Sequence, residues 1–349
     1  MIFPRLTRVA LAAALVCAAS TAVPAVASAE SDARRAVPVV FDHDMDFDDA
    51  ATLAYLCQAK KQGRIDLRAV TVTNNGSGTP GRALTHVRTE LERCGLPGIP
   101  VADGSPAGVN PQPQEGRAWT ERVLTGALGD GDRPDRPSAI PAWLLLAESV
   151  LTAPRPVVVI ATGPLTNVAK ALAVPGVASR ISRLSVMGGA FAVPGNIYGP
   201  GAARFDGSQE VNMWLDPASA ARVFGRLPGR VDIAPLDATN DVPVTQSFVD
   251  KLGTGRTPEA RLVHAILTQP DAAAGIAAGS AYWWDTLAAS VVFDRVSPVR
   301  QRVDRVAVRQ DGAAAGRTVT VPDGTPQRVG HHAELAQYER GYFAMLTGG

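Results

Sequence analysis

Carboxylates are concentrated between residues 39 and 49, where the sequence reads VVFDHDMDFDD and an apolar run gives way to a helical pattern. The acidic residues of this segment are Asp42, Asp44, Asp46, Asp48 and Asp49. Like charges this close repel and raise one another's pKa values unless a positive charge lies among them. Carboxylate oxygens suit hard cations such as calcium and magnesium, whereas zinc favours His and Cys ligands. The segment therefore predicts a divalent-metal site at the carboxyl end of a strand.

Acidic segments of this kind have two other known uses. An EF-hand loop starting at Asp42 needs Gly at its sixth position and Glu at its twelfth, where this chain has Phe47 and Leu53, so it is excluded. A haloacid-dehalogenase-type phosphatase also begins with an apolar strand and Asp-x-Asp, and residues 160–162 could imitate its second strand. Such enzymes typically carry Thr where Asp46 stands, and they leave the following acidic pair unexplained. The phosphatase stays open as a less favoured alternative.

Short apolar segments alternate with amphipathic ones along the chain. The apolar segments predict strands at residues 37–41, 67–73, 99–102, 156–162, 184–187 and 231–235. Helical patterns with Gly or Pro near their ends lie at 48–61, 81–94, 140–151, 164–173 and 217–224. This alternation is typical of an open, doubly wound, mostly parallel α/β sheet, whose ligands bind beyond the carboxyl ends of the strands. The acidic segment lies at such an end.

Two long stretches rich in Gly and Pro, 103–137 and 191–209, interrupt the alternation. Loops of this length in a compact domain are usually functional or disordered, and a position over the strand ends favours function. Near the C-terminus, residues 303–321 predict a hairpin with a turn around 312–316, and residues 334–346 predict a closing helix.

The first 29 residues have the organisation of an export signal. Arg5 and Arg8 precede an apolar stretch, and Ala27-Ser28-Ala29 has the small-x-small pattern of a signal-peptidase site. We therefore expect a secreted, extracellular protein with a flexible N-terminus over 30–35 and a single domain over 36–349. The alternative is a retained membrane anchor, for which the apolar stretch is short.

Charge, length and cysteine content limit the partners, the number of domains and the disulfides that this chain can have. Removing Arg5 and Arg8 lowers the basic count from 34 to 32 against 33 acidic residues, so the expected mature chain is nearly neutral and nothing favours nucleic acid or an anionic membrane as a partner. Its length of about 320 residues suits one large α/β domain or two small ones, and the lack of a Ser/Gly linker favours one. Cys57 and Cys94 would form a disulfide or remain as two buried thiols.

Six motifs in this chain together resemble those of the calcium-dependent nucleoside hydrolases. That family typically begins with a strand and Asp-x-Asp-x-x-x-Asp-Asp, which Asp42, Asp44, Asp48 and Asp49 match position for position. The other motifs follow in family order: ATGPLTN at 161–167, MGG at 187–189, EVN at 210–212 ahead of Asp216-Pro217, PLD at 235–237, and Trp284-Asp285. The resemblance extends from about residue 37 to the C-terminal helix and implies the Rossmann-like fold of that family.

The resemblance also implies roles for individual residues. A calcium ion would be held by Asp44, Asp49, Asp285 and the main-chain carbonyl of Thr162, and Asp44 would be the general base on a water bound to it. The ribose hydroxyls would be bound by Asp48, Asn196, Glu210 and Asn212. The implied reaction is hydrolysis of a ribonucleoside to free base and ribose, by a homodimer or homotetramer.

The chemistry of that reaction suits these residue types. Cleavage of an N-glycosidic bond passes through an oxocarbenium-like sugar, so it needs a water nucleophile, tolerance of positive charge and help for the departing base. Calcium accepts six to eight oxygens, enough to bind carboxylates, sugar hydroxyls and a water together. Because calcium acidifies water less than zinc does, a positioned base such as Asp44 remains useful.

Trp284 is a departure that bears on the leaving group. Many members with broad base preference carry His at this position as a proton donor, which Trp cannot be. The purine-preferring branch instead stacks the base between aromatic rings, and the second ring here would be Trp119, which follows Asp44 by 75 residues. The resemblance therefore implies purine nucleosides as substrates. The alternative outside enzymes is an exported protein that binds calcium and nucleosides without catalysis, against which the retention of Asp44 argues.

Overall fold

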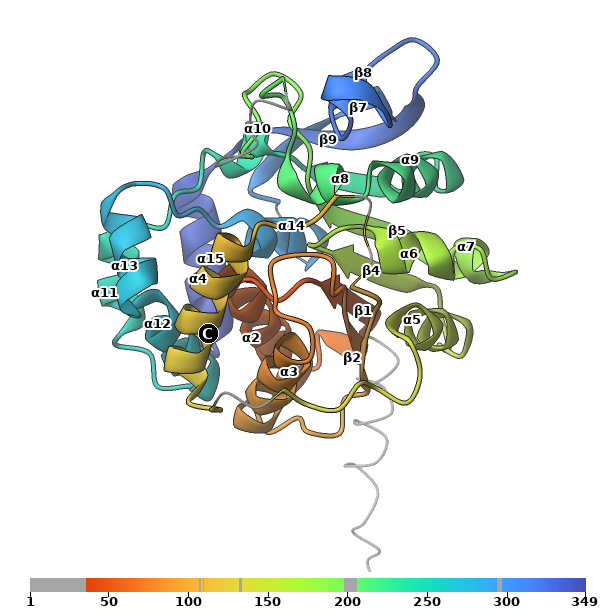
Figure 1. Cartoon of the computed structure of the whole chain (residues 1–349). Coiled ribbons are helices and arrows are strands. Elements are labelled where there is room, and N and C mark those ends of the chain that lie inside the picture. The colour runs from red at the N-terminus through yellow and green to blue at the C-terminus, as the bar shows by residue number, and fades with distance from the viewer. Residues whose placement is uncertain (1–35, 107, 109, 132–133, 198–205, 294–296) are drawn as a thin grey trace, which may run out of the picture. The chain divides into compact units, whose positions relative to one another are not determined.

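The computed structural model describes residues 36–349 apart from 107, 109, 132–133, 198–205 and 294–296. The export signal and flexible segment predicted for residues 1–35 lie outside the described residues. A nine-stranded sheet runs through the described part in the order β3-β2-β1-β4-β5-β6-β9-β7-β8 (Figure 1). Its strands are β1 (Val37–His43), β2 (Ile65–Val72), β3 (Val101–Asp103), β4 (Val157–Ala161), β5 (Ile181–Met187), β6 (Val231–Ala234), β7 (Val299–Val308), β8 (Thr318–Thr320) and β9 (Thr325–Ala333).

The sheet is parallel from β3 to β9, and β7 and β8 continue it in antiparallel pairing. The central strands are apolar on both faces because both faces are covered: Val158 and Ile160 belong to one core cluster, while Val157 and Val159 belong to the other. The strand order reverses between the neighbouring strands β1 and β4, and the connections on the two sides of this point cross opposite faces of the sheet. Ligands of doubly wound sheets bind at this switch point.

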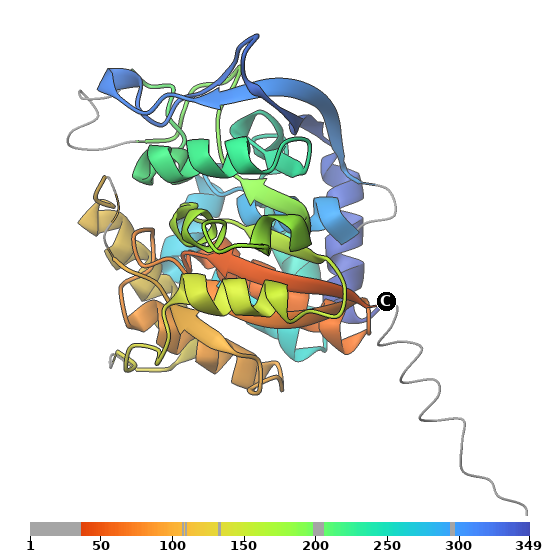
Figure 2. The ribbon, with the colours of Figure 1, turned by 90° about the vertical axis from the view of Figure 1, so that its right-hand side faces the viewer.

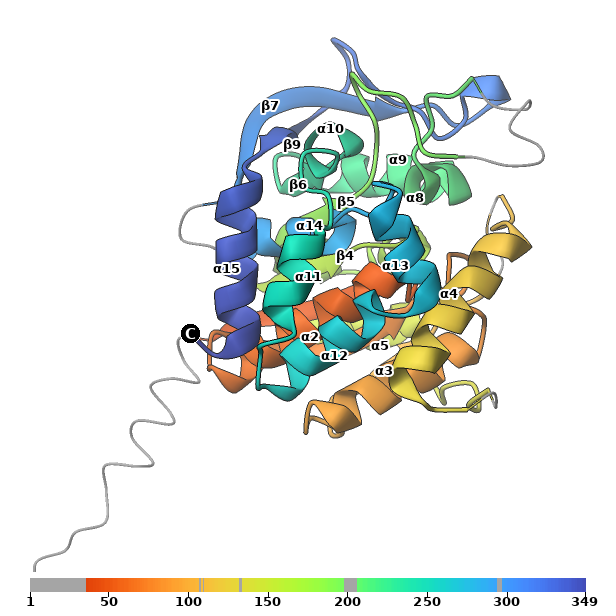
Figure 3. The same cartoon turned by 90° about the vertical axis from the view of Figure 1, so that its left-hand side faces the viewer.

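Helices form a layer on each face of the sheet. One layer, seen best in Figure 3, shares the larger core cluster. It contains α2 (Phe47–Lys61), α3 (Arg82–Arg93), α4 (Gln114–Leu128), α11 (Gln246–Leu252), α12 (Pro258–Leu267), α13 (Pro270–Ala277), α14 (Trp284–Phe293) and α15 (Leu335–Thr347). The opposite layer, in Figure 2, contains α5 (Ala142–Leu151), α6 (Thr166–Ala171), α7 (Val177–Arg180) and α9 (Pro217–Arg226). The short helices α8 (Val211–Leu215) and α10 (Leu236–Thr239) complete the fold together with the 3-10 turn Gly312–Ala314.

The doubly wound α/β class is confirmed, and each of the six predicted strands and five predicted helices has a counterpart within a few residues. The hairpin and the closing helix are also present, as β7 with β8 and as α15. Strand β9 was not predicted, although it joins this hairpin to β6. The stretch 103–137 was predicted to be a loop and contains α4, whose buried apolar residues gather in its second half. The Pro and Gly residues around α4 are typical of a loop, so its short apolar face was not recognised as part of a helix.

Cys57 and Cys94 are free, buried thiols, which is one of the two expected states. The neighbouring Cys94 side chain, together with burial, raises the pKa of the Cys57 thiol well above its usual value. Over the described residues, no helix combines the length and the apolar character that crossing a membrane requires.

Candidate active site

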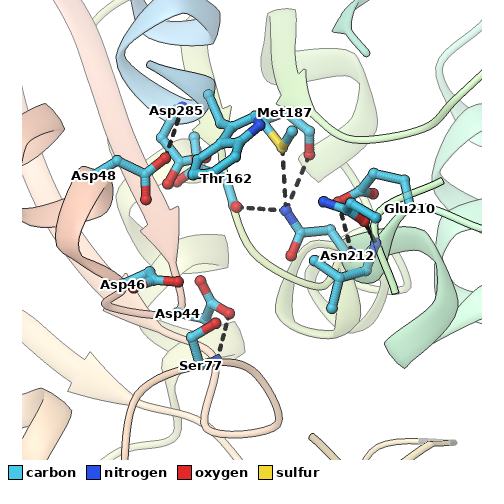
Figure 4. A pocket seen from close by; sticks show the side chains of 12 residues that line it. Asp44, Asp46, Asp48, Ser77, Thr162, Met187, Glu210, Asn212 and Asp285 are labelled. Atoms are coloured by element: carbon cyan, nitrogen blue, oxygen red, sulfur yellow. Dashed lines mark hydrogen bonds between the residues drawn. The ribbon is translucent and has the colours of Figure 1, made fainter. Parts of the chain in front are cut away.

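Most of the residues predicted from the sequence meet at the switch point of the sheet. Asp44 follows β1 and Thr162 follows β4, two strands that pair in register with Asp42 opposite Ala161. The residues beyond these strand ends line a cavity of about 130 Å³. Its lining consists of Asp44, Asp46, Asp48, Ser77, Thr162, Met187, Asn196, Glu210, Val211, Asn212, Trp284 and Asp285. Figure 4 shows the acidic side chains from the start of α2 on one side of this cavity, with Glu210 and Asn212 opposite.

Asp49 supports the acidic side of the cavity. Its Oδ2 accepts hydrogen bonds from the backbone N–H groups of Asp44 at 3.2 Å and Asp46 at 2.9 Å, and its Oδ1 accepts from Thr162 Oγ1 at 2.5 Å. Asp46 and Asp49 thereby form a capping box at the start of α2. Burial raises the pKa of Asp49, but the His43 side chain beside it and these hydrogen bonds outweigh burial and lower its pKa overall.

Asp44 is held by backbone geometry. Its Oδ2 accepts from the N–H of Ser77 at 2.6 Å, and a Cβ added at Gly76 would overlap that oxygen. The next residue, Met45, has a φ of 62° and is the only non-glycine residue with positive φ in the described part of the chain. Strained backbone of this kind persists where the surroundings dictate it, and it is common at functional sites.

The opposite wall is also held in place by hydrogen bonds. Asn212 Nδ2 donates to the carbonyl of Thr162 at 2.8 Å. Glu210 caps α8, because its Oε1 accepts from the N–H of Asn212 at 2.9 Å, and its Oε2 accepts from the N–H of Gly189 at 3.0 Å. Asn196 Oδ1 accepts from the N–H of Val211 at 2.9 Å. These polar side chains therefore face the cavity from fixed positions.

The acidic side of the cavity is electrostatically unfavourable by itself. Burial raises the pKa of Asp44 well above its usual value, and the charge of Asp49 raises it further. Burial and the neighbouring carboxylates have the same effect on the pKa values of Asp48 and Asp285. A cation among these groups would favour their charged forms and relieve the repulsion.

The donor set fits a hard cation. Asp44, Asp49, Asp285 and the carbonyl of Thr162 offer only oxygens, which suits calcium or magnesium better than zinc. The Thr162 carbonyl already accepts from Asn212 and retains a second lone pair. As the described side chains stand, no three or more His, Cys, Asp or Glu residues have a spacing that would hold a metal ion. The chemistry of the donors, rather than their spacing, therefore supports a cation site, and it does not identify the ion.

The two predicted aromatic walls occupy different positions. Trp284 lines the cavity, whereas Trp119 is half-buried and is not among the described residues that line it. Phe47 stands in edge contact with both rings, with centroid distances of 5.5 Å to Trp119 and 6.2 Å to Trp284. Trp284 and Asn196 also line an adjoining space of about 690 Å³, which includes Tyr282.

Several residues of the site were given no role from the sequence. Ser77 and Gly76 contact Asp44, and Met187 accepts from Asn212 Nδ2 through its carbonyl oxygen at 3.4 Å and lies with its Sδ 3.5 Å from the same nitrogen. The Gly-rich segment NNGSG at 74–78, directly after a predicted strand, was a usable signal. Loops at the carboxyl ends of parallel strands line the ligand site.

Comparison with known proteins identifies the family of this chain. Residues 39–339 match the family model described as inosine-uridine preferring nucleoside hydrolase. The pyrimidine-specific ribonucleoside hydrolase RihA of Citrobacter koseri is 30% identical over 238 residues, which cover 66% of this chain and 70% of that protein.

Solved structures share the fold. The inosine-uridine preferring nucleoside hydrolase of Bacillus anthracis superposes with a TM-score of 0.73 at 26% identity, covering 89% of this chain and 99% of that one. The purine-preferring ribonucleoside hydrolase of Gardnerella vaginalis superposes with a TM-score of 0.69 at 20% identity, covering 89% and 98%, which supports the fold alone. The family match overturns the phosphatase alternative. The chain belongs to the inosine-uridine preferring nucleoside hydrolase family and is a hydrolase acting on N-glycosyl bonds.

Proposed function

We propose that this protein is an exported, calcium-dependent ribohydrolase that cleaves purine ribonucleosides to free base and ribose. The observation that carries the proposal is the cavity at the switch point, where buried carboxylates face the side chains of Glu210 and Asn212. A sugar that gains positive charge as its bond to the base breaks is stabilised by such an anionic wall. The polar wall opposite offers acceptors and donors for the sugar hydroxyls.

In this proposal, Asp44, Asp49, Asp285 and the carbonyl of Thr162 would hold the calcium ion. When bound, the ion would supply Lewis acidity and orient a water and the sugar hydroxyls. Asp44 takes the proton of the attacking water as the general base. The ribose is held by Asp48, Asn196, Glu210 and Asn212.

Purine preference is the finer part of the proposal. Trp284 lines the cavity and cannot protonate a leaving base, so it contributes by stacking on the base, for which a purine offers the larger ring surface. The competing candidate is a pyrimidine nucleoside, because the relative in Citrobacter koseri is named as pyrimidine-specific. Trp119 would complete a stacking site only if the Phe47 side chain moved, since Phe47 contacts both indoles.

Export and assembly belong to the same proposal. The small-x-small site ending at Ala29 supports cleavage and secretion to the extracellular space. A homodimer or homotetramer is proposed from family resemblance. A non-catalytic protein that binds calcium and nucleosides remains the alternative to be tested.

The decisive experiment is release of ribose by the purified mature protein from inosine, adenosine, guanosine, uridine and cytidine. We expect turnover of the purine nucleosides, loss of activity after exhaustive chelation, and recovery with calcium. The Asp44→Ala variant should be inactive. Equal rates for the variant and the wild type would end the catalytic assignment, and faster turnover of uridine than of inosine would end the purine assignment.

A further inference from the structure

The position of the Asp44 carboxylate depends on the loop that follows β2. The N–H of Ser77 donates to Asp44 Oδ2 at 2.6 Å, and the N–H of Gly78 donates to the main-chain carbonyl of Asp44 at 2.8 Å. The α-carbon of Gly76 is so close that a Cβ on it would overlap the same carboxylate oxygen. A small shift of the backbone over residues 76–78 would therefore move the carboxylate or remove its hydrogen-bond donor.

This loop is itself held from outside by a guanidinium group. Arg117, in the first turn of α4, donates through Nε to the carbonyl of Gly76 and through Nη2 to the carbonyl of Asn74, both at 3.0 Å. One turn further along α4, Thr120 Oγ1 donates to Asp46 Oδ1 at 2.8 Å. Helix α4 thus contacts both segments beside Asp44, the loop after β2 and the start of α2.

An arginine suits this place better than other donors. Its planar fork offers several N–H groups in a fixed arrangement, so two carbonyls of one tight loop can be bound at once. Both bonds are charge-assisted. Because they are partly buried, solvent weakens them little. The side chain is partly buried, which lowers the pKa of Arg117, and the charge of nearby Asp44 opposes that fall.

We infer that Arg117 is a positioning residue for Asp44, acting through the backbone of residues 74–78. The inference rests on the proposed function, in which Asp44 is the base. Arg117 does not line the cavity among the described residues, so its effect is on the alignment of the reacting groups rather than on substrate contacts. Misplacement of a catalytic group by about 1 Å can lower turnover by about a hundredfold.

Arg93, the last residue of α3, provides a matched control at the far end of α4. Its Nη1 donates to the carbonyl of Ala127 at 3.2 Å, and its Nη2 donates to the carbonyl of Leu128. It therefore makes the same kind of bond as Arg117, from one guanidinium to two carbonyls. It does not line the cavity among the described residues, and its two hydrogen bonds go to α4 rather than to the loop over 74–78.

The test compares Arg117→Met, Arg117→Lys and Arg93→Met with calcium present in excess and inosine as substrate. For Arg117→Met we expect kcat to fall by about ten- to a hundredfold, with KM changed by less than about threefold. Arg117→Lys keeps the charge but not the fork, so its kcat should lie between those of wild type and Arg117→Met. Arg93→Met should keep kcat within about twofold of wild type, even if its melting temperature is lower than that of wild type.

A double-variant comparison separates positioning from general destabilisation. In an Asp44→Asn background, Arg117→Met should cause no further loss of the residual turnover, because the group that Arg117 positions is already disabled. Calcium affinity measured by calorimetry gives a readout without turnover, and Arg117→Met should weaken it while Arg93→Met should not.

Two sets of results would overturn the inference. The first set would remove Arg117 from its role while leaving the hydrolase assignment intact. It comprises a kcat for Arg117→Met within about twofold of wild type, a fully active Arg117→Lys, or an equal loss from Arg117→Met in the wild-type and the Asp44→Asn backgrounds. Absence of ribose release by the wild type, or full activity of Asp44→Asn, would instead overturn the proposed function and this inference with it.

Discussion

The backbone N–H of Asp285 lies 3.3 Å from Oδ2 of Asp48, although 237 positions separate the two residues. The contact brings the start of α14 against the start of α2, so that both helices begin at the same cavity. Burial raises the pKa of Asp285, and the charges of Asp48, Asp49 and Asp44 raise it further, because the four carboxylates form one electrostatic cluster. An acidic site assembled from both ends of the chain is the central feature of this protein.

Neutralising Asp285 should have opposite effects with and without calcium. In chelator, Asp285→Asn removes a buried charge from a repelling cluster, so the melting temperature should rise. With calcium, the variant lacks a proposed ligand, so the gain in melting temperature on adding calcium should shrink or vanish. Thermal melts of both proteins in chelator and in calcium check this. An undiminished calcium-induced gain would remove Asp285 from the ligand set.

Trp284→Ala tests the handling of the leaving base. If Trp284 stacks on a purine, the variant should lose far more turnover on inosine than on p-nitrophenyl riboside, whose leaving group needs no protonation. Steady-state kinetics on both substrates measure the difference. Tyr282→Ala is a useful comparison, because Tyr282 touches Trp284 without lining the acidic cavity among its described residues. A similar loss on both substrates for Trp284→Ala would contradict the stacking role.

Gly76→Ala tests the close approach of backbone to Asp44. The added methyl would overlap Asp44 Oδ2, so the carboxylate or the loop must move. We expect kcat to fall by about a hundredfold, as for other misplaced catalytic groups. The control is Gly98→Ala, because no heavy atom lies within 4 Å of a Cβ at that position. Activity of Gly76→Ala close to that of Gly98→Ala would show that Asp44 needs no exact placement.

The loss of stability on acidification should depend in part on Glu121 of α4. Burial raises the pKa of Glu121, but hydrogen bonds from His86 and Arg82 outweigh burial and bring the pKa down to about 2, from 4.5. Because the folded pKa lies below the ordinary value, ionised Glu121 stabilises the fold above about pH 4.5, and this contribution is lost as the pH falls toward 2. Glu121→Gln should therefore be less stable than wild type at about pH 6, and the difference should shrink toward pH 2. Urea unfolding at several pH values measures it, and a constant difference would refute the assignment.

Much of the fold was predictable because burial on both faces of a sheet imposes a continuous apolar run. The run at Val39, Val40 and Phe41 predicted β1, and the run before Thr162 predicted β4. Strand β9 was missed, since its pattern is mixed and its pairing with β6 and β7 is decided by distant residues. Helix α4 was missed because its buried residues are few and its flanks are rich in Gly and Pro.

By itself, the sequence determined most of the residues that line the cavity: the carboxylates of the first strand end, the motif carrying Thr162, the Glu210 and Asn212 pair, and Asp285. These are local patterns, readable because residue type and short spacing carry them. Only the tertiary structure decided that Phe47 contacts both Trp119 and Trp284, and that Arg117 holds the loop beside Asp44. Such contacts join segments far apart in the chain, and they depend on how helices pack over the sheet, which no local pattern records.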